Sequence, residues 1–353
     1  MDAPLWTETH APALADIPQT EVRENLQRLV ADPMNLILHG PPGSGKTAAA
    51  RALAAELHDQ PDADLIEINV ADFFGMTKSE IREDPRFERF LQGQTEFSKR
   101  YRRSPDQTNK YKRDWSKRDM LGHVLKEMAG YEPASGDFKT VLLDNSEAMR
   151  EDFQQALRRV MEQYHASTQF VIATRQPSAL IPPIRSRCFQ LPVRKPTVAE
   201  VVGVLEGIVA GEDVPSDEDG LEYVAGAADG DLREAVLSAQ TIAVQAGEIT
   251  METAYETLSA MDTNERVVEM LADAEAGEFL DARKTLDDLL VDEGYSGGEV
   301  LEDVLAVARS RYGGEELATL HRLAGDIDFD LARGTNDRLH VAHLLAEIGP
   351  REG

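Results

Sequence analysis

The chain has 353 residues, 42% of them hydrophobic, and a formal net charge of −27 because 64 acidic residues face only 37 lysines and arginines. This length suffices for two or three domains with buried cores. The single cysteine, Cys188, excludes an intramolecular disulfide and a cysteine-rich zinc site. Charged residues interrupt the apolar stretches, which excludes a membrane span, and no signal-peptide pattern is visible, so we expect a cytoplasmic protein.

The acidic excess has two interpretations. It could serve to repel nucleic acid. It is also typical of adaptation to very high salt, where surface repulsion is screened over a few ångströms, and we favour this halophilic interpretation. The charge then says little about the partners of the protein.

The first part of the sequence alternates short apolar runs with helical segments. We expect strands at residues 35–39, 65–70, 140–144, 169–174 and, more weakly, 188–191. We expect helices at 47–57, which is rich in alanine, and at 151–163. Strands that alternate with helices predict an α/β fold whose parallel sheet is covered on both faces.

Residues 40–47 read GPPGSGKT and match the P-loop pattern G-x-x-x-x-G-K-[ST], after a strand and before a helix. The glycines allow backbone N–H groups to converge on phosphate oxygens at a helix N-terminus. Lys46 would neutralise the β- and γ-phosphates, and the Thr47 hydroxyl would bind Mg²⁺. The predicted nucleotide-binding residues are Gly40, Pro41, Pro42, Gly43, Ser44, Gly45, Lys46 and Thr47, with ATP and Mg²⁺ as cofactors.

The third expected strand ends at Asp144, where a P-loop protein places the carboxylate that supports Mg²⁺. In a hydrolytic site of this type, the residue directly after this aspartate is usually a glutamate, which orients and deprotonates the attacking water. This chain has Asn145, whose amide cannot accept a proton. Glu147, two residues further on, could replace the missing glutamate only if the backbone turned its side chain toward the attacking water. We therefore expect nucleotide binding with slow or absent hydrolysis.

Two arginines lie where they could contact nucleotide. Arg187 precedes the last expected strand and could reach a neighbour's γ-phosphate with its planar donor fork. Arg233 lies near the start of a helix and could close onto bound nucleotide. The alternatives are a solvated or ion-paired Arg187, and helix capping by Asp231 with Arg233 in solvent.

After Pro192 the strands stop and the pattern is helical. Residues 197–200, 216–219 and 231–234 resemble capping boxes that open helices. Glycines at 277, 294–298 and 313–314 indicate turns between later helices. We expect an α/β domain at 1–192, a small helical domain at 193–261 and a third, helical domain at 262–353.

Residues 73–137 separate the second and third strands by more than a usual crossover, so we expect an insertion there. Within it, residues 99–118 are strongly basic and contain Tyr101, Tyr111 and Trp115. Basic side chains could pair with DNA phosphates while an aromatic ring stacks on a base. The alternative is a surface loop neutralised by nearby acidic faces. The candidate DNA-contacting residues are Arg102, Arg103, Lys110, Lys112, Arg113, Lys117 and Arg118.

Four segments together resemble the AAA+ clamp-loader family, specifically the small subunit of archaeal replication factor C, over residues 5 to about 312. They are GPPGSGKT at 40–47, DFQQALRRVMEQY at 152–164, PPIRSRC at 182–188 and GDLREA at 230–235. The resemblance implies a five-subunit spiral with ATP at the interfaces, in which the second domain is a lid and the third a collar for oligomerisation. The implied partners are large and small replication factor C subunits, the sliding clamp and primer–template DNA.

The resemblance also assigns roles by position. Arg187 becomes an arginine finger that acts in trans on a neighbour, and Arg233 a sensor on the lid side. Three changes depart from the family's pattern: Asn145 replaces an acidic residue, Arg175 replaces a sensor asparagine, and His10 with Ala11 replaces Tyr-Arg near the adenine. These changes weaken hydrolysis in cis, so we expect a divergent second type of small subunit in a hetero-oligomer. The alternative is a fully active AAA+ ATPase that remodels protein or branched DNA.

Overall fold

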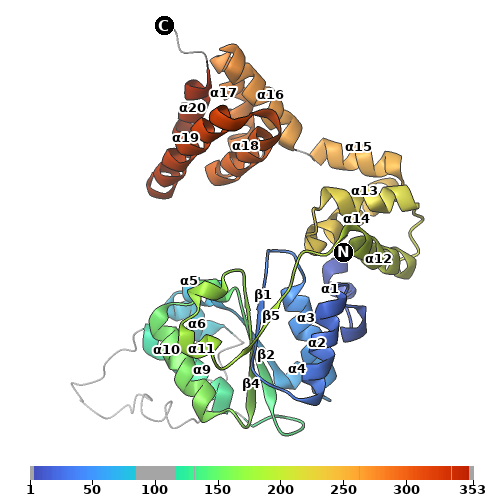
Figure 1. Ribbon diagram of the computed structural model, residues 1–353, viewed down its shortest axis with the longest axis vertical. Helices are drawn as coiled ribbons and strands as arrows, with labels where there is room; N and C mark the ends of the chain where they lie inside the picture. The colour runs from blue at the N-terminus through green and yellow to red at the C-terminus, as the bar shows by residue number, and fades with distance from the viewer. Residues whose placement is uncertain (1–3, 85–116, 131, 262, 335, 350–353) are drawn as a thin grey trace, which may run out of the picture. The chain divides into compact units, whose positions relative to one another are not determined.

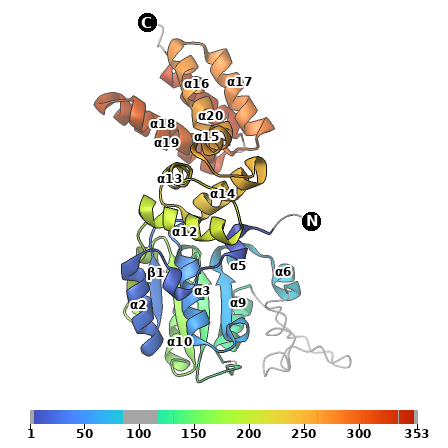
Figure 2. The same cartoon turned by 90° about the vertical axis from the view of Figure 1, so that its right-hand side faces the viewer.

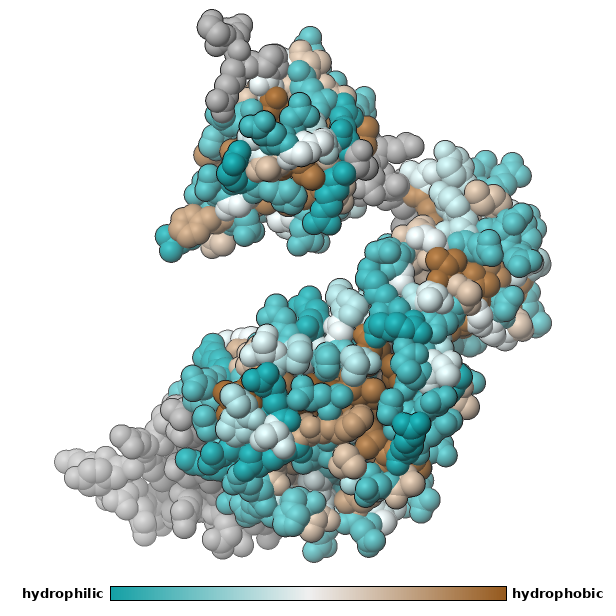
Figure 3. Space-filling view, viewed as in Figure 1, coloured by the Kyte–Doolittle hydropathy of each residue, from teal (hydrophilic) through white to brown (hydrophobic). Residues whose placement is uncertain are grey.

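The computed structural model describes residues 4–84, 117–130, 132–261, 263–334 and 336–349 (Figure 1). Its contacts divide the chain into two compact units, Met1–Ala254 and Tyr255–Gly353. The boundaries at 192 and 261 stay predictions. Hydrophilic residues cover most of the face seen in Figure 3, as the excess of acidic residues leads one to expect. Among the described residues, no helix is both long and apolar enough to span a membrane.

The first unit contains a sheet of five parallel strands in the order β2-β3-β4-β1-β5. The strands are β1 Leu36–His39, β2 Leu65–Asn69, β3 Lys139–Asp144, β4 Thr168–Thr174 and β5 Phe189–Pro192. Each lies within one residue of its expected position, and the α/β fold is confirmed. Every residue of β4 is buried, because this strand has a neighbour on each side and helices on both faces.

Helices cover both faces of the sheet (Figure 1). On one face α2 (Thr20–Ala31) and α3 (Lys46–Leu57) bury a core that includes Leu26, Leu53 and Leu38. The other face is covered by α5 (Val70–Gly75), α6 (Lys78–Glu83), α9 (Lys117–Gly130), α10 (Glu151–Gln163) and α11 (Pro182–Arg185). Short turns of helix complete the layers: α1 Trp6–Thr9, η1 Leu14–Asp16, α4 Pro61–Asp64, η2 Ser146–Ala148 and η3 Pro177–Ala179.

Both ends of the expected insertion belong to the core. Phe73 and Ile81, before the described chain stops, and Met120 and Val124, after it resumes, are at most 2% exposed and share one hydrophobic cluster with β3 and β4. Helix α9 packs against α10 and is thus the crossover helix between β2 and β3. The bounds of the expected insertion stay a prediction, and its middle, 85–116, lies outside the described residues.

Three further helices complete the first unit: α12 Val198–Gly211, α13 Glu218–Ala227 and α14 Leu232–Ala246. Figures 1 and 2 both place them beyond the same end of the sheet. Thr197 forms the expected capping box with Glu200, and Asp231 caps α14. The prediction at residue 216 was wrong by one position. Asp217 caps α13, whereas Ser216 forms a backbone bridge with Ile249.

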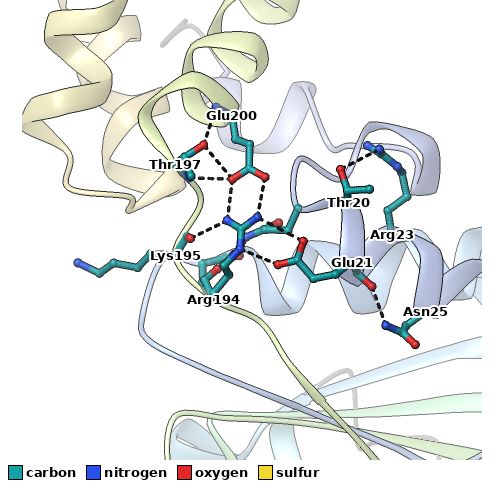
Figure 4. A network of polar contacts seen from close by, with 10 residues as sticks. Thr20, Glu21, Arg23, Asn25, Arg194, Lys195, Thr197 and Glu200 are labelled. Carbon is teal, nitrogen blue, oxygen red and sulfur yellow. Dashed lines mark hydrogen bonds and ion pairs between the residues drawn. The ribbon is translucent and has the colours of Figure 1, made fainter.

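A polar network around Arg194 joins the sheet layer to α12 (Figure 4). The Arg194 guanidinium donates to Glu200 at 2.7 and 2.8 Å and lies 2.6 Å from Glu21 of α2. Beside it, the Gln19 amide, only 1% exposed, donates to the carbonyls of Ser44 and Arg194 at 2.9 and 3.0 Å. Gln19 thus ties the P-loop to the segment that leads into α12.

All the secondary-structure elements in the described part of the second unit are helices. Its elements are α16 Thr263–Ala276, α17 Phe279–Asp287, the π-helical turn η4 Asp288–Asp292, α18 Gly297–Arg311, α19 Gly314–Arg333 and α20 Asp337–Ile348. They enclose one core, with Met270, Leu286 and Leu344 fully buried. Helix α15 (Met251–Met261) runs across the division between the units.

Candidate nucleotide-binding site

The P-loop connects β1 to α3, and its glycines meet specific backbone demands. Gly43 and Gly45 have φ of 65° and 90°, a left-handed conformation that glycine adopts without strain. A Cβ on Gly40 would lie 1.9 Å from the Val193 carbonyl oxygen, so the chain passes too closely for any side chain. Helix α3 starts at Lys46 without a side-chain cap from the described residues, and its first N–H groups can therefore bind an anion.

Lys46 and Thr47, the last two residues of the P-loop motif, both contact polar groups of the first unit. Lys46 is 9% exposed, and its Nζ donates to the Pro41 carbonyl. The Thr47 hydroxyl donates to Asp144 Oδ2 at 2.7 Å. Asp144 ends β3, two strands away from β1 in the sheet, so the parallel order of the strands brings these side chains together.

The Lys46 amine lies among several charged groups. Burial lowers its pKa, and the Asp144, Glu147 and Asp231 carboxylates oppose this effect, whereas Arg175 adds to it. Three carboxylates and a guanidinium therefore act on one amine. A polyphosphate bound beside Lys46 would add further negative charge to these carboxylates. Its affinity would therefore depend on the positive charges nearby, among which are those of Lys46 and Arg175.

Asn145 offers no proton acceptor for an attacking water. It adopts a left-handed conformation with φ of 50°, which asparagine tolerates better than most residues. Its side-chain nitrogen donates to Asn69 Oδ1 at 3.2 Å, and its backbone N–H donates to Asp144 Oδ1 at 2.8 Å. The position after Asp144 is thus taken by an amide that bonds to another amide.

Glu147 is held by its neighbours. Its carboxylate accepts from the Thr174 hydroxyl at 2.9 Å, from the Arg175 backbone N–H at 3.1 Å and from Arg175 Nε at 2.7 Å. Burial would raise the pKa of Glu147, but these hydrogen bonds outweigh it and hold the pKa below its ordinary value. A carboxylate so engaged is a weak base.

A cavity of about 1160 Å³ extends from the P-loop to the helices beyond the sheet. Its polar end is formed by Lys46, Thr47, Asp144, Asn145, Glu147 and Arg175, and Arg233 joins them from α14. Its other end is lined by apolar side chains, among them Pro12, Val204, Ile208 and Val236. Such a site suits a ligand with an apolar ring system and a strongly anionic tail.

Sequence reasoning missed the small residues of α12 that line this cavity. Ala199, Gly203 and Gly207 are four residues apart, so they share one face of the helix. A Cβ on either glycine would meet no atom within 4 Å, so both leave room in the cavity. The spacing is visible in the sequence and could have been found.

The N-terminal segment and α14 close the cavity. His10, at the position where the family has Tyr, lines it and has Nε2 2.5 Å from Glu212 Oε1 at the end of α12. The N–H of Leu232 donates to the Gly43 carbonyl at 3.0 Å. A Cβ on Gly43 would lie about 2 Å from the Asp231 carboxylate, so the start of α14 touches the P-loop directly.

Arg187 does not line the cavity. Its guanidinium donates to Glu162 at 2.6 Å and to the Pro183 carbonyl at 2.7 Å, and its side chain is 38% exposed. Of the alternatives, the ion-paired surface arginine is thus what the isolated chain contains.

Five of the candidate DNA-contacting residues fall outside the described part of the chain: Arg102, Arg103, Lys110, Lys112 and Arg113. The backbone of Lys117 and Arg118 begins α9, but their side chains are not described. The proposed role of these basic residues stays a prediction.

Two family models match the chain. Residues 36–194 match the ATPase family associated with various cellular activities (AAA), and residues 263–347 match the replication factor C C-terminal domain. The replication factor C small subunit of Staphylothermus marinus is 30% identical, over 98% of this chain and 94% of that protein. The chain belongs to the replication factor C small-subunit family. The small subunit of Halobacterium salinarum is 28% identical, over 98% and 95% of the two chains.

Solved structures share the fold of this replication factor C family member. A variant of Thermotoga maritima RuvB has a TM-score of 0.51 at 15% identity and covers 81% of both chains. At this identity the likeness shows the AAA+ fold alone. The family assignment and the fold class drawn from the sequence are confirmed.

Proposed function

We propose that the protein is a clamp-loader subunit that binds ATP with Mg²⁺, hydrolyses it slowly or not at all in its own site, and supplies Arg187 to a neighbour's site. One observation carries this proposal. The P-loop side chains are arranged for binding, whereas Asn145 bonds to Asn69 and Glu147 bonds to Arg175. The described polar end of the cavity thus offers no free general base.

The oxygen donors at the P-loop fit Mg²⁺. The Thr47 hydroxyl and the Asp144 carboxylate meet at 2.7 Å, and Mg²⁺ takes hard oxygen ligands together with substrate phosphates. Bound there, the ion would neutralise charge on the phosphates. Lys46 would exchange the Pro41 carbonyl for a phosphate oxygen. Arg233 would reach the nucleotide from α14.

The exposure of Arg187 supports a role in trans. It lies outside the cavity of its own chain, and its hydrogen-bond partners among the residues that the structure describes are Glu162 and the Pro183 carbonyl. A guanidinium that pairs with a γ-phosphate stabilises the charge that develops in phosphoryl transfer. The match of residues 263–347 to the replication factor C C-terminal domain supports a place for the chain in that complex.

The partners we propose are those of the family: large and small replication factor C subunits, the sliding clamp and primer–template DNA, in the cytoplasm. The protein would be a second type of small subunit beside a standard one. Its basic residues within 99–118 would contact DNA phosphates inside the assembly.

The test is the ATPase of the complex reconstituted with the large subunit, the other small subunit, clamp and primer–template DNA. We expect Arg187→Ala to lower this ATPase by roughly 10³-fold at the affected site. Arg28→Ala, which removes another exposed, ion-paired arginine, is the matched control and should change nothing. Unchanged ATPase in the Arg187 variant would exclude the role in trans.

A further inference from the structure

We propose that Gln240 of α14 is a positioning residue for the base of the bound nucleotide. Its side chain holds the segment 4–10 in place, so that Trp6 and Thr7 cover the end of the cavity where a base would lie. The inference rests on the proposed function, since it needs nucleotide in the P-loop. It concerns a residue that touches neither the P-loop nor the phosphates.

The Gln240 amide bonds to backbone from the other end of the sequence. The residue is buried, with 8% of its surface exposed. Its Oε1 accepts from the backbone N–H of Trp6 at 3.0 Å, across 234 residues of sequence. Its Nε2 donates to the Pro4 carbonyl at 2.9 Å. The oxygen and the nitrogen of one amide therefore both serve the same short stretch of backbone.

Helix α1 depends on such a contact because it is too short to be stable by itself. It is a single turn, Trp6–Thr9, and its N-cap residue Leu5 provides no side-chain cap. An isolated turn is marginal in water, and the first N–H groups of a helix have no partner within it. Gln240 bonds to one of these groups from α14, the helix against which α1 packs. Without the amide, the buried Trp6 N–H would lose its partner, which favours release of the segment.

The segment that Gln240 holds lies at the apolar end of the cavity. Trp6 and His10 both line the cavity. Gln240 follows the apolar lining residue Val236 by four positions, so the two share a face of α14. At its other end the segment meets α12, because a Cβ on Gly211 would lie 3.1 Å from His10 Cε1. The segment thus runs between two helices that supply apolar side chains to the lining.

The position of this segment should act on the base and not on the phosphates. The phosphates would bind at Lys46 and Thr47, at the polar end of the cavity. If only a fraction of the molecules hold the segment in place, the affinity for a ligand that contacts it falls by that fraction. A purine buries more apolar surface than a pyrimidine, so its binding should depend more on the segment.

A second glutamine of α14 provides the matched control. Gln245 is exposed and does not line the cavity. Methionine keeps the unbranched stem of glutamine but lacks the N–H donor and the carbonyl acceptor. The same substitution at the two positions therefore differs in whether it removes the bonds to the segment.

The experiment is calorimetric titration of the full-length chain with Mg²⁺–ATP and Mg²⁺–UTP. The wild type should bind ATP more tightly than UTP. We expect Gln240→Met to weaken ATP binding roughly tenfold and to leave UTP binding within about threefold. Retained UTP binding would also show that the site of the variant is folded. Gln245→Met should change neither affinity.

The emission of Trp6 gives a second readout. The chain has two tryptophans, so Trp115→Phe leaves Trp6 as the only one. Trp6 is 6% exposed, and in this background its emission should be that of a buried indole. Gln240→Met should shift the emission to longer wavelength, because the released ring meets water. Unshifted emission would show that the amide does not hold the segment and would overturn the inference.

Equal weakening of ATP and UTP by Gln240→Met would assign the residue a general structural role and overturn the inference. No weakening of either would also overturn it, as would equal affinities of the wild type for the two nucleotides. In these cases nucleotide binding by the wild type would still stand. If the wild type bound neither nucleotide, the proposed function itself would fail, and this inference with it.

Discussion

Arg175 Nε donates to Glu147 Oε1 at 2.7 Å, so two charged residues that line the cavity beside the P-loop neutralise each other. The pair joins the ends of β3 and β4, 28 residues apart in sequence. To act as a base in place of Asn145, Glu147 would have to give up this bond and those from Thr174 and the Arg175 backbone. The pairing thus supports the proposal that the site binds ATP without cleaving it.

Replacement of Lys46 by alanine should abolish tight ATP binding. We expect the affinity to fall by roughly a hundredfold or more, because the variant lacks the amine that would pair with the β- and γ-phosphates. The free energy of unfolding should not fall, since burial of the amine is unfavourable. Calorimetry and thermal melts measure the two effects. Lys195→Ala, which removes a more exposed lysine paired with Asp229, is the control. ATP binding within a few-fold of wild type would contradict this role for Lys46.

Asp144→Asn should remove the Mg²⁺ dependence of ATP binding. The Asp144 carboxylate accepts from Thr47 where the ion would bind, and an amide is a poor ligand in its place. We expect the ATP affinity of the variant in EDTA to be close to that of the wild type. Added Mg²⁺ should tighten ATP binding by the wild type but not by the variant. If Mg²⁺ still tightened binding in the variant, the ion would have to be held elsewhere.

Gln19→Ala should destabilise the first unit by about 1–3 kcal/mol, because it leaves the buried Ser44 carbonyl and the partly buried Arg194 carbonyl without their shared donor. The amide now bridges Ser44 of the P-loop and Arg194. Denaturant unfolding measures the loss, and the exposed Gln190→Ala is the control, with an expected change within about 0.5 kcal/mol. A Gln19 variant as stable as this control would show that the bridge contributes nothing.

The free energy of unfolding should depend on pH in the acidic range because of Glu200. The Arg194 guanidinium lowers the pKa of Glu200 to about 2, so the folded chain binds fewer protons there than the unfolded chain. This contribution is therefore present above the ordinary pKa and is lost as the pH falls towards about 2. Denaturant unfolding across this range should show a smaller decline for Glu200→Gln than for wild type. Equal declines would mean that the pair does not titrate as described.

Much of this fold could be predicted because its signals are local. The strands are short apolar runs next to recognisable motifs. The start of α12 is indicated by the capping-box pair Thr197 and Glu200. Helix α9 was missed because a basic stretch of unusual composition precedes it, although Met120, Val124 and Met128 repeat at helical spacing and are buried. Asp217 rather than Ser216 caps α13, since backbone pairing with Ile249 occupies the serine.

The site was only partly predictable for a different reason. The P-loop and Asp144 follow from motif and strand position. The bonds of Glu147 to Arg175 and of Asn145 to Asn69 depend on which strand ends are neighbours. The contact of Asp231 with Gly43 depends on how α14 meets the P-loop. Sequence spacing does not carry this information.

The fate of bound ATP tests the central claim most directly. The purified chain would be loaded with Mg²⁺–ATP, freed of excess nucleotide, and its bound nucleotide recovered over time in the presence of primer–template DNA. The account predicts that ATP is recovered intact long after a standard small subunit has converted its own to ADP. Conversion to ADP that Asp144→Ala and Glu147→Gln both abolish would contradict it.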